Sequence, residues 1–353
     1  MAKLGDPRRL PLGVFYAAVL PILALSILTA IEIGSTPIAW RTILHVTGVK
    51  LLPTGWIDPS GITPADTVIV WLIRVPRVVV AAFVGMGLAA AGAVMQGLFR
   101  NPLAEPGLVG TGAGAVLGAV LTFVTGWSVR SVVSLPVAAM LGAFLALVLV
   151  YAMATRGGTT PVGTLLLAGI AMTSLLSAIS SLLLSLNIVN WQIAQEIVFW
   201  MMGGLDARSW THVWLCAPFV SLGLAASMFQ ARDLDLLQQG EETAASFGVD
   251  VESSKRFLAL TAAMLTGSAV AVAGMVGFVG LVVPHAVRLL VGPSNRALIP
   301  ASAAAGALFL VLCDLLARTV HPPVEIRLGV VTALVGGPLF IALLMRRYAE
   351  AGK

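Results

Sequence analysis

Long apolar runs separated by short polar stretches constrain this chain more than any other feature of its sequence. Of its 353 residues, 58% are hydrophobic and 10% are charged, whereas charged residues make up about 25% of an ordinary soluble domain. One bilayer span takes about 20 apolar residues, and the 36 glycines suit helices that pack closely in lipid. The sequence therefore predicts an all-α polytopic membrane protein and excludes a soluble enzyme.

Apolar runs divide the chain into ten candidate transmembrane spans. They are residues 10–33, 78–99, 107–127, 133–155, 162–186, 211–230, 257–280, 281–292, 297–319 and 326–345. Residues 34–68 are predicted to form an external loop with one short interfacial helix, and the Trp-rich segment 187–210 to form a helix at the membrane interface. No separate soluble domain fits in the remainder, so residues 1–353 form a single transmembrane domain.

The distribution of positive charge indicates the orientation. An even number of spans places both termini on one side, and assigning that side to the cytoplasm puts 13 of the 21 Lys and Arg residues inside, as the positive-inside rule expects. The first run exceeds the about 7–15 residues of a signal-peptide core, so we expect it to be retained. The prediction is a multi-pass protein of the bacterial inner (plasma) membrane with cytoplasmic termini, no nucleic-acid partner and an arginine-rich outer face.

Motifs of catalysis are missing. The sequence has no G-x-x-x-x-G-K-[ST], H-E-x-x-H or G-x-S-x-G motif and no pair of His or Cys at metal-ligand spacing. Its histidines lie on different segments, at His45, His212, His285 and His321. We therefore predict a non-catalytic protein with no metal site and no permanently bound cofactor.

Small residues indicate where the spans pack. Gly110, Gly114 and Gly118 recur every four residues, and Gly85, Ala89 and Ala93 do so in the preceding span. Such stripes let helix backbones approach each other in a membrane. We interpret both as packing faces rather than as the wall of a pore.

Two polar groups interrupt the apolar pattern. Gln96 precedes Arg100–Gly107, where prolines break the helix; this segment is either an ordinary turn or a constriction on a transport path. Asp314 and Arg318 are four residues apart, a spacing that allows an ion pair on one helix face. Such a pair is either a functional site or simple mutual neutralisation.

The longest polar stretch, residues 231–256, holds many charged and Gln side chains interleaved with Leu, Ala, Phe and Val. This pattern predicts two short amphipathic helices. Because isolated helices of this length are marginal in water, they must pack on their own bundle or on another protein. We favour a partner protein on the cytoplasmic side.

Several motifs together resemble a known family. They are RVPRVVVAAFVGMGLAAAGAVMQGLFRNPLAEPGLVGTGAGA (74–115), LLLAGIAM (165–172), WMMGGLD (200–206), GEETAASFGV (240–249), GFVGLVVPHAVRLL (277–290) and GVVTALVGGPLFIALL (329–344). In this order the chain is similar to the iron-chelate, haem and cobalamin permeases of ABC importers, the type II importers. The resemblance covers nearly the whole chain.

The resemblance implies a ten-span permease that works as a homodimer in membrane lipid, with two ATPase subunits that use ATP and a periplasmic substrate-binding protein. It assigns contact with the ATPase to the loop 231–256, through Gly240, Glu241, Glu242, Ala244, Phe247 and Gly248. It assigns docking of the binding protein to Arg74 and Arg318. A cytoplasmic gate is implied at Asn101, Pro102, Leu103, Thr159, Thr160, Pro161, Val162 and Gly163, although Gly157, Gly158 and Pro161 depart from the family pattern.

The resemblance leaves the substrate open. We expect haem, with a ferric siderophore or cobalamin as alternatives within the family. The rival class is a stand-alone secondary transporter, which would place coupling carboxylates or broken helices mid-membrane. Here Glu105, Asp314 and Glu325 lie near the predicted span ends. A membrane-embedded enzyme is disfavoured because no nucleophile and base are paired.

Overall fold

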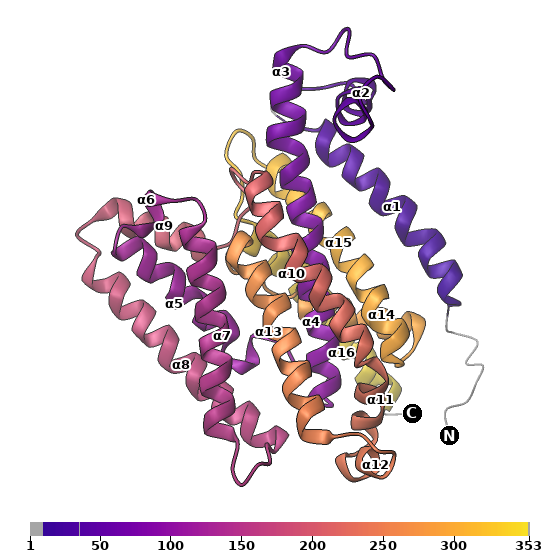
Figure 1. The fold of residues 1–353 in the computed structure, drawn as a ribbon, viewed down its shortest axis with the longest axis vertical. Coiled ribbons are helices and arrows are strands. Elements are labelled where there is room, and N and C mark those ends of the chain that lie inside the picture. The colour runs from indigo at the N-terminus through magenta and orange to yellow at the C-terminus, as the bar shows by residue number, and fades with distance from the viewer. Residues whose placement is uncertain (1–9, 35, 352–353) are drawn as a thin grey trace.

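The chain folds as a bundle of helices (Figure 1) in the computed structural model, which describes residues 10–34 and 36–351. The α-helices are α1 (Leu12–Glu32), α2 (Trp40–Leu51), α3 (Pro64–Thr67), α4 (Val75–Leu98), α5 (Thr111–Val124), α6 (Trp127–Arg130), α7 (Ser134–Ala154), α8 (Val162–Leu186), α9 (Trp191–Met201), α10 (Trp210–Phe229), α11 (Ala231–Gln239), α12 (Glu241–Ser246), α13 (Val251–Ala273), α14 (Val279–Val291), α15 (Asn295–Thr319) and α16 (Leu328–Ala351). A π-helical segment, η1 (Val68–Arg74), precedes α4, and a 3-10 turn, η2 (Pro106–Val109), precedes α5.

Among the residues that the structure describes, ten apolar helices correspond to the ten predicted spans. Seven are long enough to cross a membrane by length and composition, with Pro64–Leu98 counted as one continuous helix. Three are shorter, namely Thr111–Val124, Val279–Val291 and Leu328–Leu343. The predicted all-α polytopic architecture is confirmed, and α9 and α2 form where short interfacial helices were expected.

Two predicted spans begin too late, for one physical reason. The second was expected after Arg77, but its helix begins at Pro64, with a Thr63–Asp66 capping box at its start. The seventh was expected from residue 257 and begins at Val251. Both predicted boundaries follow charged residues, yet Arg77 and Lys255 are paired with carboxylates and are therefore tolerated within these helices.

Helix α4 occupies the centre of the bundle (Figure 1), surrounded by α10, α13, α14 and α15. Its packing depends on glycine: a Cβ on Gly85 would overlap the carbonyl oxygen of Gly306, and one on Gly92 would overlap that of Gly280. Gly114 meets Gly142 of α7 in the same way. The predicted packing role is confirmed for Gly85 and Gly114, since no larger side chain leaves room for the facing backbone. Gly110 instead lies just before α5 with φ 81° and serves the turn.

Helices α5 and α14 start inside the bundle rather than at its ends. Residues 101–110 turn back beside α4, so that a Cβ on Gly280 would lie 2.7 Å from the ring of Pro106 and 2.9 Å from the oxygen of Leu88. Phe278, with φ 67°, comes directly before α14. Non-helical backbone at this depth is tolerated where it is buried in protein. The segment around Pro106 is therefore more than a surface turn.

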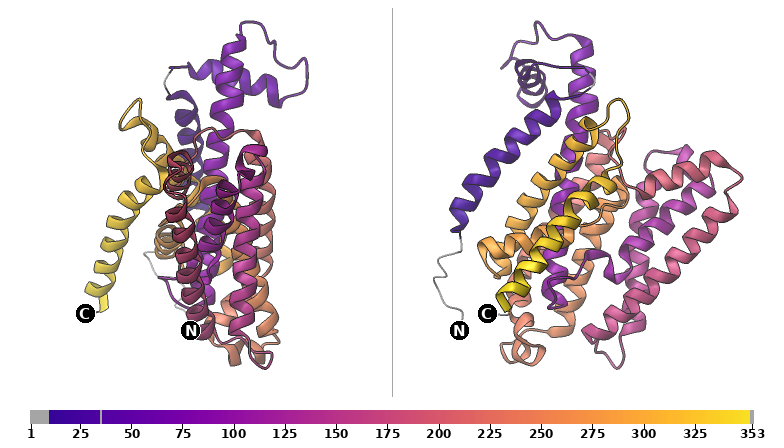
Figure 2. Two further views of the ribbon diagram at one scale, coloured as in Figure 1. Left: turned by 90° about the vertical axis from the view of Figure 1, so that its left-hand side faces the viewer. Right: turned by 180° about the vertical axis from the view of Figure 1, so that it is seen from behind.

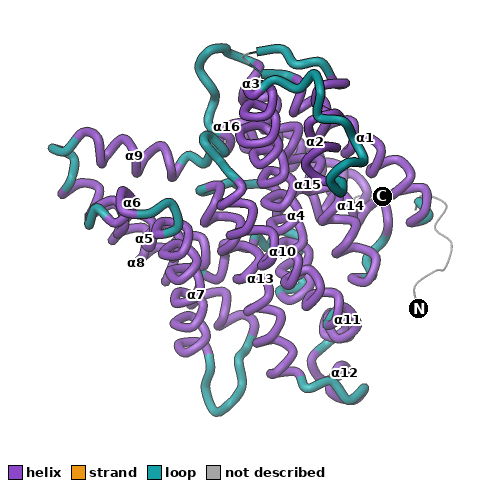
Figure 3. Tube along the Cα trace, turned by 45° about the horizontal axis from the view of Figure 1, so that its top comes forward, coloured by secondary structure: helices purple, strands orange, loops and turns teal. Residues whose placement is uncertain are grey.

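The two ends of the bundle carry different structures. The upper end in Figure 1 holds α2, α3 and the loops 202–209 and 320–327, and the lower end holds α11, α12 and the turn 156–161. Figure 3 shows loops gathered at these ends. Figure 2 shows α16 leaning away from the bundle toward the lower end. We use "upper end" and "lower end" in this sense below.

Candidate functional site

The loop 231–256 folds as two short helices, as its sequence pattern predicts. The apolar side chains of α11 and α12 face the bundle, where Leu234, Leu237 and Ala244 are buried. Gly240 joins the two helices with φ 137°, a backbone conformation that disfavours residues with a Cβ. Gly248, with φ 82°, follows α12 in the same way. The two glycines predicted in this loop therefore serve its turns.

Helix α11 is bonded to the start of α15. Asp235 accepts hydrogen bonds from the backbone nitrogen of Asn295 at 2.8 Å and from its side-chain nitrogen at 2.6 Å. A carboxylate here satisfies a backbone donor that the first turn of a helix leaves free, and it complements the helix dipole. The position of α11 is thus set by the core of the bundle.

Helix α12 is held by an ion pair with α13. Glu241 forms an ion pair with Lys255 of α13 at 3.1 Å, and Lys255 is also 2.6 Å from Glu252. The same ammonium donates to the carbonyl oxygen of Thr160 at 2.7 Å. We call Thr160, Glu241, Glu252 and Lys255 the lower cluster. It joins a predicted ATPase-coupling residue, Glu241, to a predicted gate residue, Thr160.

The other predicted coupling residues divide into buried and exposed ones. Ala244 is fully buried, so it packs α12 on the bundle. Glu242 is exposed and forms no ion pair with the described residues. Phe247 is 65% exposed although it is aromatic. An apolar side chain presented to solvent beside acidic residues is what a protein-binding surface offers.

The predicted gate residues come from two segments that meet at the lower end. A cavity of about 630 Å³ is lined by Phe99, Arg100, Val162 and residues 239–243. Around this cavity the end of α4 lies next to the start of α8 and to residues 239–243 of the coupling helices α11 and α12. The side-chain oxygen of Asn101 accepts a hydrogen bond from the backbone of Leu103 at 2.9 Å, which closes a tight turn around Pro102. The role of these residues as a gate stays a prediction.

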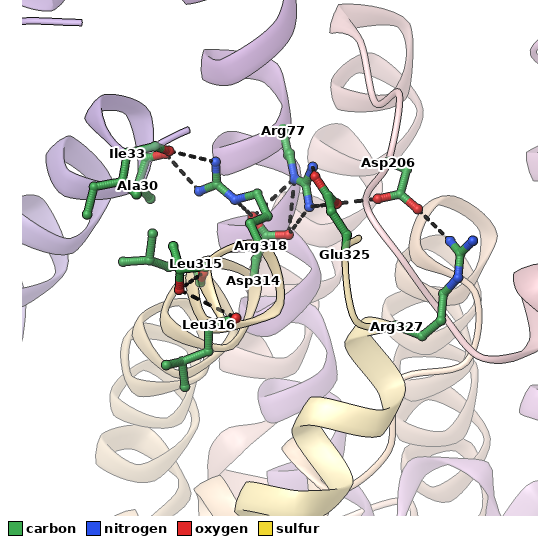
Figure 4. Close-up of polar contacts among 11 residues, drawn as sticks. Ala30, Ile33, Arg77, Asp206, Asp314, Leu315, Leu316, Arg318, Glu325 and Arg327 are labelled. Atoms are coloured by element: carbon green, nitrogen blue, oxygen red, sulfur yellow. Dashed lines mark hydrogen bonds and ion pairs between the residues drawn. The ribbon is translucent and has the colours of Figure 1, made fainter. Parts of the chain in front are cut away.

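Six charged side chains form a connected group at the upper end, shown in Figure 4. We call this group the upper network. It consists of Arg77, Asp206, Asp314, Arg318, Glu325 and Arg327. Its members come from α4, from α15 and from the loops 202–209 and 320–327. The predicted ion pair between Asp314 and Arg318 is confirmed at 3.3 Å, but it is one part of a larger arrangement.

Arg77 lies at the centre of the upper network (Figure 4). Its guanidinium is 2.9 Å from Asp314 and 2.8 Å from Glu325, and both contacts use two nitrogens. Asp314 is 1% exposed. A buried carboxylate needs such partners because an unpaired charge in a low-dielectric interior is costly. Asp206 extends the network to Arg327, whose guanidinium lies over the ring of Phe199 at 4.2 Å.

Burial and neighbouring charges shift the pKa values of the two loop carboxylates, Glu325 and Asp206, in opposite directions. Burial alone would raise the pKa of Glu325, but hydrogen bonds from Arg77 and the nearby arginine charges lower that pKa to about 2. The pKa of Asp206 is raised, first by burial and then by the adjacent Glu325. Burial lowers the pKa of Arg208 to about 10. Asp206 therefore takes up a proton before Glu325 as the pH falls.

The two arginines predicted to dock a binding protein both hold the end of α1. Arg74 donates to the carbonyl oxygens of Ile31 and Glu32, each at 2.8 Å, and to that of Thr36. Arg318 donates to the oxygens of Ala30 at 2.8 Å and Ile33 at 3.1 Å. The last carbonyls of a helix lack intrahelical partners, so these bonds give both arginines a structural task. Docking through them stays a prediction.

Sequence reasoning found the pair within one helix and missed the partners from distant segments. Asp314 and Arg318 share a helix face, so their spacing was informative. Arg77 and Glu325 are 248 positions apart in the chain, and Lys255 and Thr160 are 95 apart. No local pattern reports such contacts. The available signal was the presence of Arg77 and Lys255 beside apolar runs, since a charge at that place needs a partner.

Comparison with known proteins agrees with this architecture. Residues 22–346 match the FecCD transport family. The chain is 40% identical to the cobalamin import system permease protein BtuC of Halobacterium salinarum, covering 94% of this chain and 95% of that protein. It is 37% identical to the hemin transport system permease protein HmuU of Yersinia pestis, covering 96% of each. A solved metal-chelate type ABC transporter in an inward-facing conformation superposes with a TM-score of 0.82 at 28% identity, covering 95% of this chain and 99% of that chain.

Fold and comparisons together define a polytopic, non-catalytic permease subunit of an ABC importer. The chain belongs to the FecCD transport family. Membership implies ATPase and binding-protein partners, which gives the exposed residues of α12 and the loops of the upper end a functional context.

Proposed function

We propose that this chain is the permease of a homodimeric importer, with its lower end in the cytoplasm. Two ATPase subunits bind the coupling helices α11 and α12, and a periplasmic binding protein delivers substrate to the upper end. The observation that carries the proposal is the arrangement of α12, where Glu242 and the following Phe247 are exposed while Ala244 and Glu241 hold the helix on the bundle. A fixed helix with an exposed apolar side chain can receive force from a partner.

A binding test follows from the exposure of Phe247. Because this side chain makes little contact with its own chain, Phe247→Ala is expected to leave the fold intact and to weaken ATPase binding about tenfold, as loss of an aromatic interface residue does. Binding of the purified ATPase subunit to the permease in nanodiscs measures this. Phe144→Ala, which truncates a 50% exposed aromatic of α7, is the matched control. Equal loss of binding in both variants would contradict the assignment.

For the substrate, we propose a metal tetrapyrrole, with haem as first candidate and cobalamin as second. The sequence motifs favour haem. Two relatives support the class: the permease from Halobacterium salinarum is named for cobalamin and that from Yersinia pestis for hemin. Both align over nearly their whole length, so the likeness includes the path as well as the coupling loop. A ferric siderophore is the remaining alternative, because the Escherichia coli permease FecD, named for ferric dicitrate, is 36% identical.

Transport into proteoliposomes distinguishes these substrates. The permease is reconstituted with its ATPase and binding protein, and uptake of haem, cobalamin and a ferric siderophore is measured with and without ATP. ATP-dependent uptake of one tetrapyrrole is expected. Uptake of the siderophore alone would overturn the substrate proposal. Uptake driven by an ion gradient without ATP would favour the secondary-transporter class instead.

A further inference from the structure

Lys255 is a buried lysine whose hydrogen-bonding capacity is filled by three separate elements. Its side chain is 2% exposed in the first turn of α13. A lysine ammonium has three N–H donors, and three acceptors lie around it: Thr160 of the turn 156–161, Glu241 of α12 and Glu252 of α13. The lysine therefore connects the coupling helix to the turn between α7 and α8.

The turn 156–161 is a stiff unit. Arg156 and Thr159 exchange two backbone hydrogen bonds, of 3.0 and 3.1 Å, around the left-handed glycines 157–158. The next residue, Thr160, is held at both of its backbone groups, because its N–H donates to Glu252 at 3.0 Å and its C=O accepts from Lys255. A displacement of the lower cluster therefore moves the whole turn instead of being absorbed within it.

The turn leads directly into α8, a helix with one face exposed and one face packed on the bundle. Pro161 is the residue before the first turn of this helix. Along α8, Leu167 is 69% exposed, Leu175 56% and Leu182 58%, and Figure 1 shows the helix at the outside of the bundle. Its opposite face packs on the bundle through Leu165, Gly169 and Met172. Because the turn continues into this helix without a break, a displacement of the turn reaches the base of α8.

We propose that Lys255 is a positioning residue that makes α12, the first turn of α13 and the turn 156–161 move as one body. This rests on the proposed function, in which an ATPase subunit pushes or pulls on α12. Separating α12 from the turn would leave a buried ammonium with an unfilled donor, which is costly. The lysine therefore transmits movement of α12 to the base of α8.

The experiment measures whether α12 and the turn move together. Nitroxide labels are placed at Arg156→Cys and Ala245→Cys, two exposed positions, while the native cysteines Cys216 and Cys313 are buried. Distances are measured in the permease–ATPase complex with and without a non-hydrolysable ATP analogue. We expect one narrow distance, unchanged between the two states. In Lys255→Met the distance distribution should broaden or shift when the analogue binds.

Matched variants separate transmission from mere stability. Glu241→Ala removes the α12 acceptor of the cluster but leaves Lys255 paired with Glu252, so it should broaden the distance without unfolding the protein. Glu196→Ala, at an exposed position of α9 far from the lower cluster, is the control and should leave the distance unchanged. Lys255→Arg, which keeps a charge and donors, should restore part of the coupling. Substrate uptake per ATP hydrolysed should fall about fivefold in Lys255→Met, within the usual range of coupling energies.

The outcomes distinguish this inference from the proposed function. If the unmodified permease fails to bind the ATPase, the proposed function and this inference both fail. If binding and coupling are normal but Lys255→Met and Glu241→Ala keep the narrow distance and the native uptake per ATP, only the role of Lys255 is overturned.

Discussion

The upper network and the lower cluster both stabilise buried charges, but they pair these charges in different ways. Both place charged side chains inside an apolar bundle and pair them across elements distant in the chain. At the upper end Arg77 contacts three acidic residues and Asp314 contacts two arginines, so several charges share the pairing. At the lower end one ammonium, that of Lys255, serves every acceptor. In the upper network the remaining ion pairs can persist when one peripheral side chain is removed. In the lower cluster, loss of Lys255 leaves all three acceptors without this donor.

The comparison also separates two kinds of element. The upper network joins α4 and α15, which lie in the core, to loops, and it closes that end of the bundle. The lower cluster joins α12 and the turn 156–161, which lie at its margin. We therefore expect substitutions at the upper end to act mainly on stability and those at the lower end mainly on coupling.

The largest effect is expected for Asp314→Asn. This carboxylate is 1% exposed and contacts Arg77 and Arg318, so its removal leaves two cations poorly compensated. Breaking a buried pair in this way costs about 3–5 kcal/mol. Thermal unfolding in detergent should show a strongly lowered midpoint. Glu325→Gln, at the exposed side of the same network, is the control, and an equal loss in both variants would show that burial does not decide the effect.

The next effect concerns coupling. Replacing Glu241 and Glu242 together by Lys should lower substrate-stimulated ATPase activity, and the single variants sharpen this. Glu241→Lys places a second cation beside Lys255 and should lower stimulation about fivefold. Glu242→Lys changes only an exposed charge and should have a smaller effect. Unaltered stimulation in the double variant would contradict the assignment of this loop as the ATPase contact.

A smaller effect is expected from pH. The pKa of Glu325 is about 2 in the folded protein, below its ordinary value of 4.5. Its contribution to stability is therefore present above about pH 4.5 and is lost as the pH falls toward 2. The raised pKa of Asp206 acts in the opposite direction. Because Glu325 is 37% exposed and water screens it, the change should stay below about 1 kcal/mol. Unfolding midpoints from pH 6 to about pH 3 should show a slope that Glu325→Gln reduces.

The smallest effect concerns docking. Arg74→Glu with Arg318→Glu should weaken association of the binding protein by only about threefold, because both side chains are largely buried. The effect should be larger at low salt because screening is weaker there. Their bonds to the end of α1 also predict lowered thermal stability. Arg41→Glu, an exposed arginine of α2, is the comparison. Lowered stability with salt-independent affinity would leave Arg74 and Arg318 with a structural role alone.

Residue order alone determined the class of this protein and most of its helices. Span length, charge scarcity and the amphipathic pattern of 231–256 are local properties, so they predicted the ten apolar helices and the two short helices of the loop. The spacing of Asp314 and Arg318 predicted their ion pair because both lie on one helix. Gly85 and Gly114 marked packing faces because close approach of backbones requires the absence of a side chain.

Tertiary structure decided which charges meet. The charge of Arg77 predicts a span boundary because charge is unfavourable in lipid, yet α15 and the loop 320–327 supply carboxylates that allow it to lie within a helix. Lys255 was only one of many charges in a polar loop until the turn 156–161 was placed against it. The sequence indicates that a charged residue beside an apolar run requires an oppositely charged partner, and only the folded bundle determines which distant residue is that partner.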